Sequence, residues 1–572
     1  MAIRPTAKGI KRGQERTIQS LTLPAPQGGV DARSPLATMA GSNSIYSYNL
    51  TVQEGAVELR AGYREWSLGL EQTTNLSAGT LIPHTTAGSN YLWAVTNEGI
   101  WNVTDYNTAP VHELQPDSTG VAVDDWTDTS ADASYGVFTA FTADNGDEYV
   151  LYADSRNGLW QRNVSAPTSP ELWIRPNLTS PGGANPDVNV EDINFVVVHK
   201  QRIWVVEKDK NYAHYLGLGA ISGATTVFFF GSKFKYGGGI AGLFNWTVDG
   251  GAGVDDYLVA VGEGGDLIPY RGIDPSQDDW QNVGSFYIGK PPIGGTFASE
   301  YAGELYFLSE FGVIAMSDIL KGVDLGDSNR NPNSLSFLIT KLLRKDVAQR
   351  SNSYGWQMIF APSRGDLIIN TPQAGVTQPT QYVLNLSMGA WSFWRDIPMS
   401  AVIDWNTSVY ILAEPSGSVC SNAYIMDVNR DNVKIVPPTS GQNGDDINFS
   451  ILTSFSRLGA DTVYKKVQYV RTDFLASNAP TLNTRVLYDY NINEPTTPVS
   501  PPDEGVLVSG LWDISTWDNA LWAQGQYASP SNVTIGANGM GRSVAIAIRG
   551  TAIDKTVLLS WDISWIAGNY AL

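Results

Sequence analysis

The stretch YLWAVTNEGIWNVT, residues 91–104, consists of a short apolar segment, a tight turn that contains Gly99, and a second short apolar segment. This pattern predicts a β-hairpin, because apolar runs of four to eight residues bounded by turn residues are typical of buried strands. Six further stretches have the same form, and their starts follow one another at intervals of 48 to 57 residues. They are EYVLYADSRNGLWQRN (148–163), RIWVVEKDKNYAHYLG (202–217), YLVAVGEGGDLIPYRG (257–272), LYFLSEFGVIAMSD (305–318), GWQMIFAPSRGDLIIN (355–370) and SVYILAEPSGSVCSNA (408–423).

Seven similar hairpins at nearly constant spacing predict a β-propeller of six or seven blades. A propeller blade is a four-stranded sheet that needs about 40 to 50 residues, so each hairpin fits as part of one blade. The pairs Asn145-Gly146 and Asn157-Gly158 suit two-residue hairpin turns, which require positive φ. A row of β-sandwich domains is the alternative, but sandwiches rarely keep such a period.

The composition agrees with an all-β fold. Charged residues make up 16% of the 572 residues, against roughly 25% in an average domain. The chain contains 56 Gly, 18 Trp and 26 Tyr, which favour strands and turns over exposed helices. The length is too great for one ordinary hydrophobic core, so we expect several domains or one large closed architecture.

The predicted domains are an N-terminal arm and platform segment (1–78), a propeller (79–430) and a C-terminal β-sandwich-like domain (431–572). The proline-rich stretch NEPTTPVSPPDEG, residues 493–505, predicts an extended linker within the last domain. Beyond it, Trp512, Trp517 and Trp522 are expected to anchor a sandwich core, since aromatic side chains dominate such packing.

One segment departs from the strand pattern. Residues 334–350, SLSFLITKLLRKDVAQR, place leucine and isoleucine at helical spacing, with basic residues on the other face. The preceding DSNRNPN supplies turn and capping residues. We expect one amphipathic helix that packs on the propeller, and its basic face is a candidate for docking on a partner.

Basic residues are also concentrated near the N-terminus, where residues 1–20 are polar. A disordered tail and an arm that orders on a neighbouring subunit are both open interpretations. Arg60 and Arg64 are expected either to bind neighbouring acidic surface or to be solvated. The candidate partner-contact residues are Arg4, Lys8, Lys11, Arg12, Arg60, Arg64, Lys341, Arg344 and Lys345.

No motif for a known catalytic or cofactor-binding site occurs. A P-loop, a G-x-S-x-G elbow, an H-E-x-x-H motif and a dinucleotide fingerprint are all missing. The four histidines (His84, His112, His199 and His214) lie far apart without ligand spacing, and the single Cys420 excludes an intramolecular disulfide. Adjacent carboxylates such as Asp278-Asp279 arise by chance among 57 acidic residues. We therefore expect no enzyme activity, no cofactor and no metal.

The charge balance sets expectations about partners. With 37 basic and 57 acidic residues, the net charge is −20, which makes non-specific binding to nucleic acid or anionic lipid unfavourable. An acidic lining would nevertheless let DNA slide past without adhering. No apolar run of 18 residues and no secretory signal occur, so we expect no membrane span and synthesis in the cytoplasm.

Three stretches resemble the tail nozzle proteins of short-tailed phages, a family that includes the tail tubular protein B type and the packaged-DNA stabilisation type. The first, residues 28–66 (GGVDARSPLATMAGSNSIYSYNLTVQEGAVELRAGYREW), has Asn49, Gly55, Arg60 and Gly62 in the pattern of that family's N-terminal region. The others are YVLNLSMGAWSFWRDIPMSAV (382–402), similar to one of its blades, and SFSRLGADTVYKKVQYVRTDF (454–474), similar to the strand pair after its propeller.

The resemblance implies a structural virion protein in the phage tail that assembles in the host cytoplasm. It implies a homohexameric ring beneath the head-to-tail adaptor that closes the DNA exit channel, retains the packaged genome and conducts it during ejection. It also implies contacts with tail fibres, spikes or a needle, and passage of double-stranded DNA without sequence-specific binding.

Two other function classes remain open from the sequence. A receptor- or glycan-binding tail propeller would use exposed Trp and Tyr on its loops, and would bind as an isolated monomer. A tail-associated glycan hydrolase would need a pair of carboxylates whose substitution abolishes activity.

Overall fold

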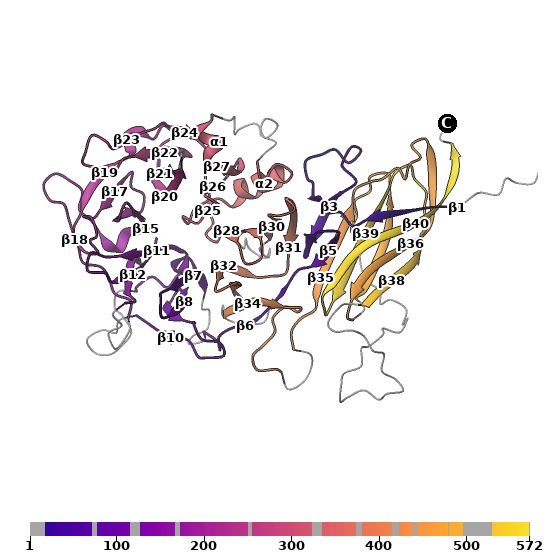
Figure 1. Ribbon diagram of the computed structural model, residues 1–572, viewed down its shortest axis with the longest axis horizontal. Helices are drawn as coiled ribbons and strands as arrows, with labels where there is room; N and C mark the ends of the chain where they lie inside the picture. The colour runs from indigo at the N-terminus through magenta and orange to yellow at the C-terminus, as the bar shows by residue number, and fades with distance from the viewer. Residues whose placement is uncertain are drawn as a thin grey trace, which may run out of the picture.

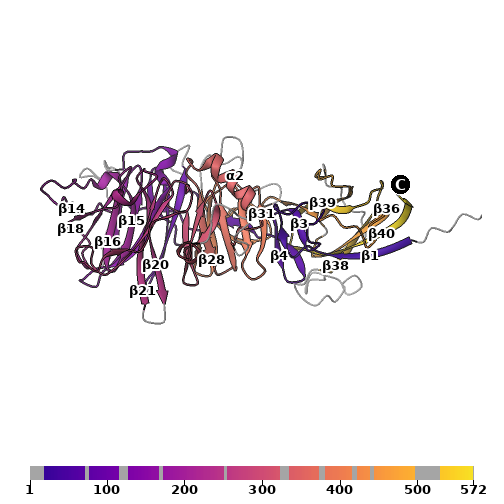
Figure 2. The same ribbon diagram turned by 90° about the horizontal axis from the view of Figure 1, so that it is seen from above.

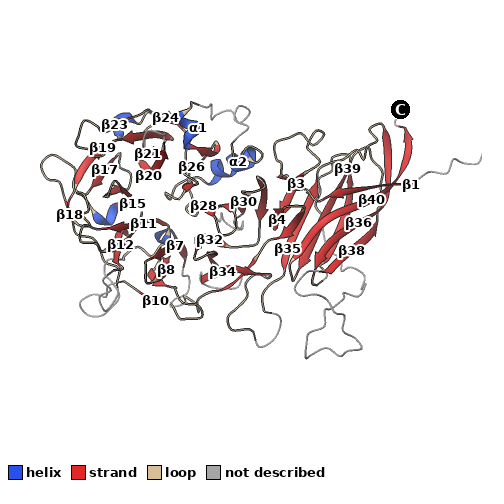
Figure 3. Ribbon diagram, in the orientation of Figure 1, coloured by secondary structure: helices blue, strands red, loops and turns tan. Residues whose placement is uncertain are grey.

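The structure is a computed structural model, and it is built almost entirely from β-strands (Figure 3). It describes residues 18–70, 77–114, 126–165, 172–249, 254–322, 334–372, 380–414, 422–438, 443–478, 480–495 and 529–570. Two α-helices occur in these residues, α1 (Met316–Leu320) and α2 (Thr340–Arg350), with short 3-10 turns at Ala131–Ser134, Val190–Asp192 and Gly231–Lys233. The predicted all-β fold class is confirmed.

Seven sheets stand around a common axis and form a seven-bladed propeller (Figure 1). Blade one contains β7 (Ala78–Thr85), β8 (Asn90–Thr96), β9 (Gly99–Asn102) and β10 (Val111–His112), and blade two contains β11 (Gly136–Thr142), β12 (Glu148–Asp154) and β13 (Gly158–Asn163). Blade three contains β15 (Ile193–His199), β16 (Arg202–Glu207), β17 (Tyr212–Tyr215) and β19 (Thr226–Phe229), and a separate parallel pair, β14 (Leu178–Thr179) and β18 (Gly223–Ala224), accompanies it in sequence.

The remaining blades complete the ring. Blade four contains β20 (Ile240–Asp249), β21 (Val254–Gly262), β22 (Asp266–Arg271), β23 (Gln281–Asn282) and β24 (Phe286–Tyr287). Blade five contains β25 (Ala298–Tyr301), β26 (Glu304–Ser309) and β27 (Gly312–Ala315), and blade six contains β28 (Gln357–Ala361), β29 (Asp366–Asn370), β30 (Gln381–Asn385) and β31 (Ala390–Trp394). Blade seven contains β32 (Met399–Trp405), β33 (Ser408–Ala413), β34 (Asn422–Val428) and β6 (Gly62–Glu65).

The ring closes in two ways. The inner strand β7 of blade one packs against β32 of blade seven. The outer strand of blade seven, β6, comes from the N-terminal part of the chain and pairs with β34. Central strands such as β12 and β29 bury most of their residues, because each blade packs its two faces against its neighbours.

Two layers of strands, one a separate sheet and the other a continuation of the blade-six sheet, form the predicted β-sandwich beside the propeller (Figure 1). One contains β1 (Ile18–Pro24), β4 (Leu50–Gln53), β5 (Ala56–Leu59), β36 (Val463–Ala476), β38 (Ser529–Gly536) and β40 (Thr556–Tyr570). The other contains β2 (Gly29–Val30), β3 (Asn43–Tyr48), β35 (Ile447–Thr453), β37 (Thr481–Tyr488) and β39 (Val544–Ala552). A buried apolar cluster with Leu50, Phe449, Phe474, Trp561 and Trp565 lies between them.

The sandwich and the propeller share one continuous nine-stranded sheet. Strand β31 of blade six pairs in parallel with β2 and β3, and β3 pairs with β35 of the sandwich. Strands from the predicted N-terminal segment, residues 1–78, are therefore distributed over both bodies. Trp512, Trp517, Trp522 and most of the predicted linker lie outside the described residues.

The predicted helix at 334–350 is shorter in the structure. Helix α2 begins only at Thr340, because residues 334–339 form turns whose polar side chains bond to blade five. The Oγ of Ser334 donates to the Val313 carbonyl, and the Ser336 Oγ accepts from the Val313 N–H. As predicted, the helix packs its apolar side chains on the propeller, where Leu343 and Val347 are fully buried.

Candidate functional site at the joint between propeller and sandwich

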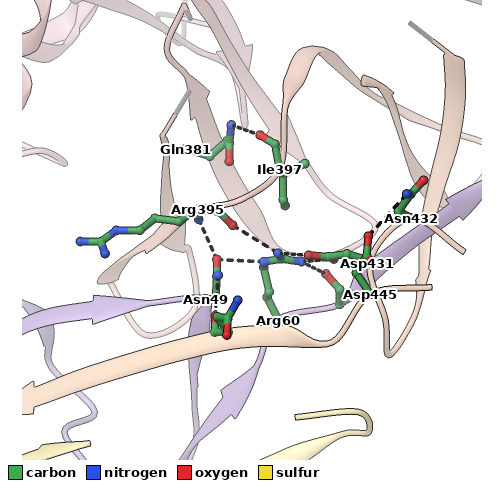
Figure 4. Close-up of polar contacts among 10 residues, drawn as sticks. Asn49, Arg60, Gln381, Arg395, Ile397, Asp431, Asn432 and Asp445 are labelled. Carbon is green, nitrogen blue, oxygen red and sulfur yellow. Dashed lines mark hydrogen bonds and ion pairs between the residues drawn. The ribbon is translucent and has the colours of Figure 1, made fainter. Parts of the chain in front are cut away.

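Arg60 is the most extensively bonded charged residue at the boundary between the two bodies (Figure 4). It lies between β5 of the sandwich and β6 of blade seven, and its side chain is buried. Two of its nitrogens donate to the Asp431 carboxylate at 2.7 and 2.6 Å. The other donors reach Asn49 Oδ1 at 2.9 Å and the carbonyls of Ala61 and Arg395 at 3.0 and 3.3 Å. All five N–H groups of the guanidinium are thus satisfied inside the protein.

Asn49 connects this pair to blade six and to sandwich strand β35. Its φ of 59° is left-handed, a conformation that asparagine tolerates better than most residues. Its side-chain oxygen accepts from Arg60 and from the Arg395 N–H at 2.7 Å, and its amide nitrogen donates to the Asn448 carbonyl at 2.7 Å. Its backbone N–H donates to the Phe393 carbonyl at 2.7 Å. Asn49 therefore joins the N-terminal segment to blade six and to sandwich strand β35.

Asp431 supplies the propeller side of the joint. It follows β34 of blade seven, and its backbone exchanges hydrogen bonds with Asp445. Burial raises the pKa of Asp431, while the charge of Arg60 opposes this increase. A buried ion pair of this kind is stable only with both partners present, because a single buried charge loses its solvation without compensation.

These contacts correct the prediction for Arg60. Its burial between two bodies of its own chain leaves no surface for a second protein to contact. Arg64 also binds its own chain, since two of its nitrogens donate to Asp427 at 2.8 and 2.7 Å, but this pair is about one-third exposed. Both arginines thus bind acidic residues of blade seven.

The other predicted contact residues lie elsewhere. Lys341, Arg344 and Lys345 are exposed on α2, and their role in partner contact stays a prediction. Arg4, Lys8, Lys11 and Arg12 lie outside the described residues. The structure therefore does not bring the nine candidates together.

A cavity of about 350 Å³ lies on the propeller axis, lined by the inner strands. Gly294 and Gly295 of the connection before blade five lie in its wall, and a Cβ at Gly295 would contact Val137 of blade two and Phe195 of blade three. The connection therefore crosses the axis. Glu300 is the only carboxylate among the lining residues that the structure describes. Glycoside hydrolysis needs a pair of carboxylates, and the described lining of this cavity supplies only one.

No group of three or more His, Cys, Asp or Glu side chains in the described residues is arranged to hold a metal ion. His199 and His214 are buried separately, and His199 shares a 2.9 Å hydrogen bond with Asn245. Burial lowers the pKa of both histidines, so they are neutral near pH 7.

The buried carboxyl group of Asp154, at the end of β12 in blade two, makes the stability of the protein depend on pH. One oxygen accepts the backbone N–H groups of Arg156 and Asn157, whereas the other is buried without a hydrogen-bond partner. Burial raises its pKa to about 7. The folded protein therefore holds a proton that the unfolded chain releases above about pH 4, so stability falls as the pH rises from about 4 to 7.

An Asp154→Asn variant removes this proton and keeps an oxygen acceptor for the turn. We expect the wild type to lose on the order of 2 kcal/mol of unfolding free energy between pH 5 and pH 8 relative to the variant. Urea unfolding at several pH values measures this difference. Parallel pH profiles for the two proteins would contradict it.

Comparisons with known proteins add little to this description. No protein-family model and no curated protein matches the chain. Solved structures similar to it include BBS1N in complex with ARL6DN, at 12% identity over 64% of this chain and 98% of that chain, with a TM-score of 0.34. A glycoside hydrolase family 43 arabinoxylan arabinofuranohydrolase from Bacillus subtilis matches at 9% identity over 91% of this chain and 99% of that chain, with a TM-score of 0.24. The propeller is therefore assigned from the chain's own strand pairings.

Within the described residues, no helix has the length and apolar character needed to cross a membrane.

Proposed function

We propose that the chain is a structural virion protein that forms the tail nozzle of a short-tailed phage. The proposal rests on the contacts that join the propeller to the sandwich. Asn49, Arg60 and Gly62, which lie in the stretch that resembles the nozzle family, hold the propeller against the sandwich. A ring that closes a channel against packaged DNA needs subunits whose two bodies do not hinge freely. A fully satisfied buried ion pair and a shared sheet supply that rigidity.

The proposal places the DNA between subunits. A cavity of about 350 Å³ on the propeller axis has room for only about twelve water molecules, at roughly 30 Å³ each. A DNA duplex is far larger, so it cannot pass through one propeller. In the proposed ring, several copies surround a shared channel beneath the head-to-tail adaptor, and fibres, spikes or a needle bind to their outer surfaces. Six copies follow from the family resemblance.

The proposed role is not enzymatic. Acid–base hydrolysis requires two positioned groups, and the axial cavity presents one carboxylate among its described lining residues. In this role the protein closes the exit channel and conducts DNA through it, and neither task needs a reactive side chain.

Antibody labelling of purified particles, imaged by negative-stain electron microscopy, tests this function. We expect label at the tail of a single vertex, and we expect particles that lack the protein to lose their DNA. Label at fibre tips would instead favour a receptor-binding propeller. Particles without any label would overturn the virion role.

A further inference from the structure

Strand β1 pairs with β40 over its whole length, yet six of its seven residues are exposed and the seventh, Leu23, is half-buried. Two of the exposed side chains are apolar, since Ile18 is 54% and Leu21 is 39% exposed. In the part of the chain that the structure describes, β1 pairs with no strand other than β40. One row of its backbone N–H and C=O groups is therefore free to pair with a further strand.

Strand β38 forms the opposite edge of the same sheet, where β36 is its only partner among the described strands. Figure 2 shows β1 and β38 in the sandwich, away from the blades. The order across this part of the sheet is β38, β36, β40 and β1, and each neighbouring pair is antiparallel. Strands β1 and β38 thus run in opposite directions. When a second copy is placed with its β38 beside β1, the new pair is antiparallel as well.

Five residues of β1 and five of β38 lie on the same rows of paired residues across the sheet. The pairings of β1 with β40, of β40 with β36 and of β36 with β38 connect residues 20–24 to residues 536–532. Leu23 and Ile535 both pack on the buried cluster of the sandwich, and residues two positions along a strand share its face. An unshifted contact between two copies therefore places apolar beside apolar side chains on the core side, and threonine beside threonine on the outer side. The matched positions are Leu21 with Ile535, Thr22 with Thr534, and Leu23 with Val533.

Neither edge strand has the charges that commonly keep the edges of sheets apart. The sequences of β1 (IQSLTLP) and β38 (SPSNVTIG) contain no charged residue, and their prolines stand at Pro24, the last residue of β1, and at Pro530, outside the five shared rows. Edge strands usually carry charges, central prolines or bulges that prevent pairing with other chains. Strand β37, the sandwich edge of the other layer, has the exposed Arg485 in its middle. The edges formed by β1 and β38 are thus the ones suited to pairing.

We propose that β1 of one copy of this chain pairs with β38 of a second copy, so that joined copies share one continuous antiparallel sheet. In such strand addition, main-chain hydrogen bonds supply affinity and the side chains select the register. A shift by one residue would turn Leu21 and Leu23 away from the apolar face of the neighbouring strand, so these leucines disfavour it. The contact joins two different edges, so it is head-to-tail and repeats from copy to copy until the rotation closes a ring.

The inference rests on the proposed function for the ring, and it names the contact between neighbouring subunits. Its failure is distinguishable from failure of the nozzle role. Labelled tails, together with edge variants that assemble as the wild type does, would show that the ring uses another contact. Copies that pair through β1 and β38, without label on particles, would show self-association without a nozzle role.

Two double variants of the full-length protein test the pairing. Both place charges at Ser20 of β1 and Gly536 of β38, which lie on the same row of the sheet. Both positions are exposed, and a Cβ at Gly536 meets no atom within 4 Å. In the like-charge variant, Ser20→Lys/Gly536→Lys, the new side chains repel each other at every contact between copies. In the opposite-charge variant, Ser20→Lys/Gly536→Glu, they attract each other there.

Sedimentation velocity and mass photometry measure assembly over a range of protein concentrations. We expect the wild type and the opposite-charge variant to form assemblies of several copies. The like-charge variant is expected to assemble at least about fivefold more weakly than the opposite-charge variant, since like charges on facing strands oppose pairing and opposite charges favour it.

Ala37→Lys/Ala40→Lys is the matched control, because it adds the same charge as the like-charge variant at exposed positions between β2 and β3. It should assemble as the wild type does. Equal weakening of the control and the like-charge variant would reduce the effect to net charge and overturn the proposal. A wild type that stays monomeric up to about 50 µM, a concentration that would populate even a micromolar complex, would also overturn it. If both edge variants lose assembly equally, the copies do not join β1 to β38, and the proposal is wrong.

Discussion

An Arg60→Ala variant is expected to lose about 3 to 5 kcal/mol of unfolding free energy. The substitution leaves the Asp431 carboxylate buried without its partner, and it removes the donors to Asn49 and to the Arg395 carbonyl. Because these groups belong to both bodies, the propeller and the sandwich should also unfold in separate steps. Calorimetry and urea unfolding followed by tryptophan fluorescence measure the separation of the transitions and the lost stability.

Arg64→Ala is the matched control, four residues along the chain. Arg64 makes the same two-pronged contact, with Asp427, but that pair is partly exposed. Its loss is expected to cost no more than about 1 kcal/mol, because water solvates the remaining carboxylate. Equal losses of unfolding free energy from the two variants would show that the buried Arg60 pair stabilises the protein no more than the partly exposed Arg64 pair does.

The propeller was predictable because its signal is local. Five of the seven quoted stretches coincide with the second and third strands of a blade, which are neighbours in sequence and share a tight turn. The stretch at 408–423 covers β33 and only the first two residues of β34. The stretch at 355–370 instead covers the first and second strands, β28 and β29, of blade six. Either pair of strands gives two apolar runs with a turn between them. The spacing of the stretches along the sequence therefore stays nearly constant even where the pair of strands differs.

The blade number and the course of the N-terminal segment were not predictable from such patterns. Blade seven takes its outer strand, β6, from a segment more than 350 residues away from β34. Likewise β1 pairs with β40, where Ile18 lies opposite Ile566. Pairings of this kind depend on tertiary packing, and nothing near either strand in sequence encodes them.

Single residues at the joint were equally hard to predict from the sequence. Arg60 and Arg64 stand four positions apart in one polar stretch, and only the register of the surrounding strands buries the first and exposes part of the second. Asp431, the essential partner, lies 371 residues from Arg60 and has no distinctive neighbours. Asn49 and Gly62 were the usable signals, since both residue types occur where backbone geometry or space is restricted.

Gly62→Val is expected to open the ring of blades. A Cβ at this position would lie closer than 3.0 Å to three backbone atoms of Arg430, which cannot move aside as a flexible side chain could. Strand β6 must then leave β34, at a cost of about 3 kcal/mol or more from overpacking and lost pairing. Detachment also frees Arg64, so trypsin should cut after this residue much faster than in the wild type. Limited proteolysis with mass spectrometry measures the rate of that cleavage.

Gly41→Val controls for the residue change itself. A Cβ at Gly41 meets no atom within 4 Å, and its φ lies outside the left-handed region, so we expect a stability change of no more than about 0.5 kcal/mol and no new cleavage. If Gly62→Val left both the melting temperature and the cleavage after Arg64 unchanged, the pairing of β6 with β34 would not be what closes the propeller. Faster cleavage in the Gly62 variant alone ties ring closure to the backbone contact between β6 and Arg430, in the same connection that holds Asp431 against Arg60.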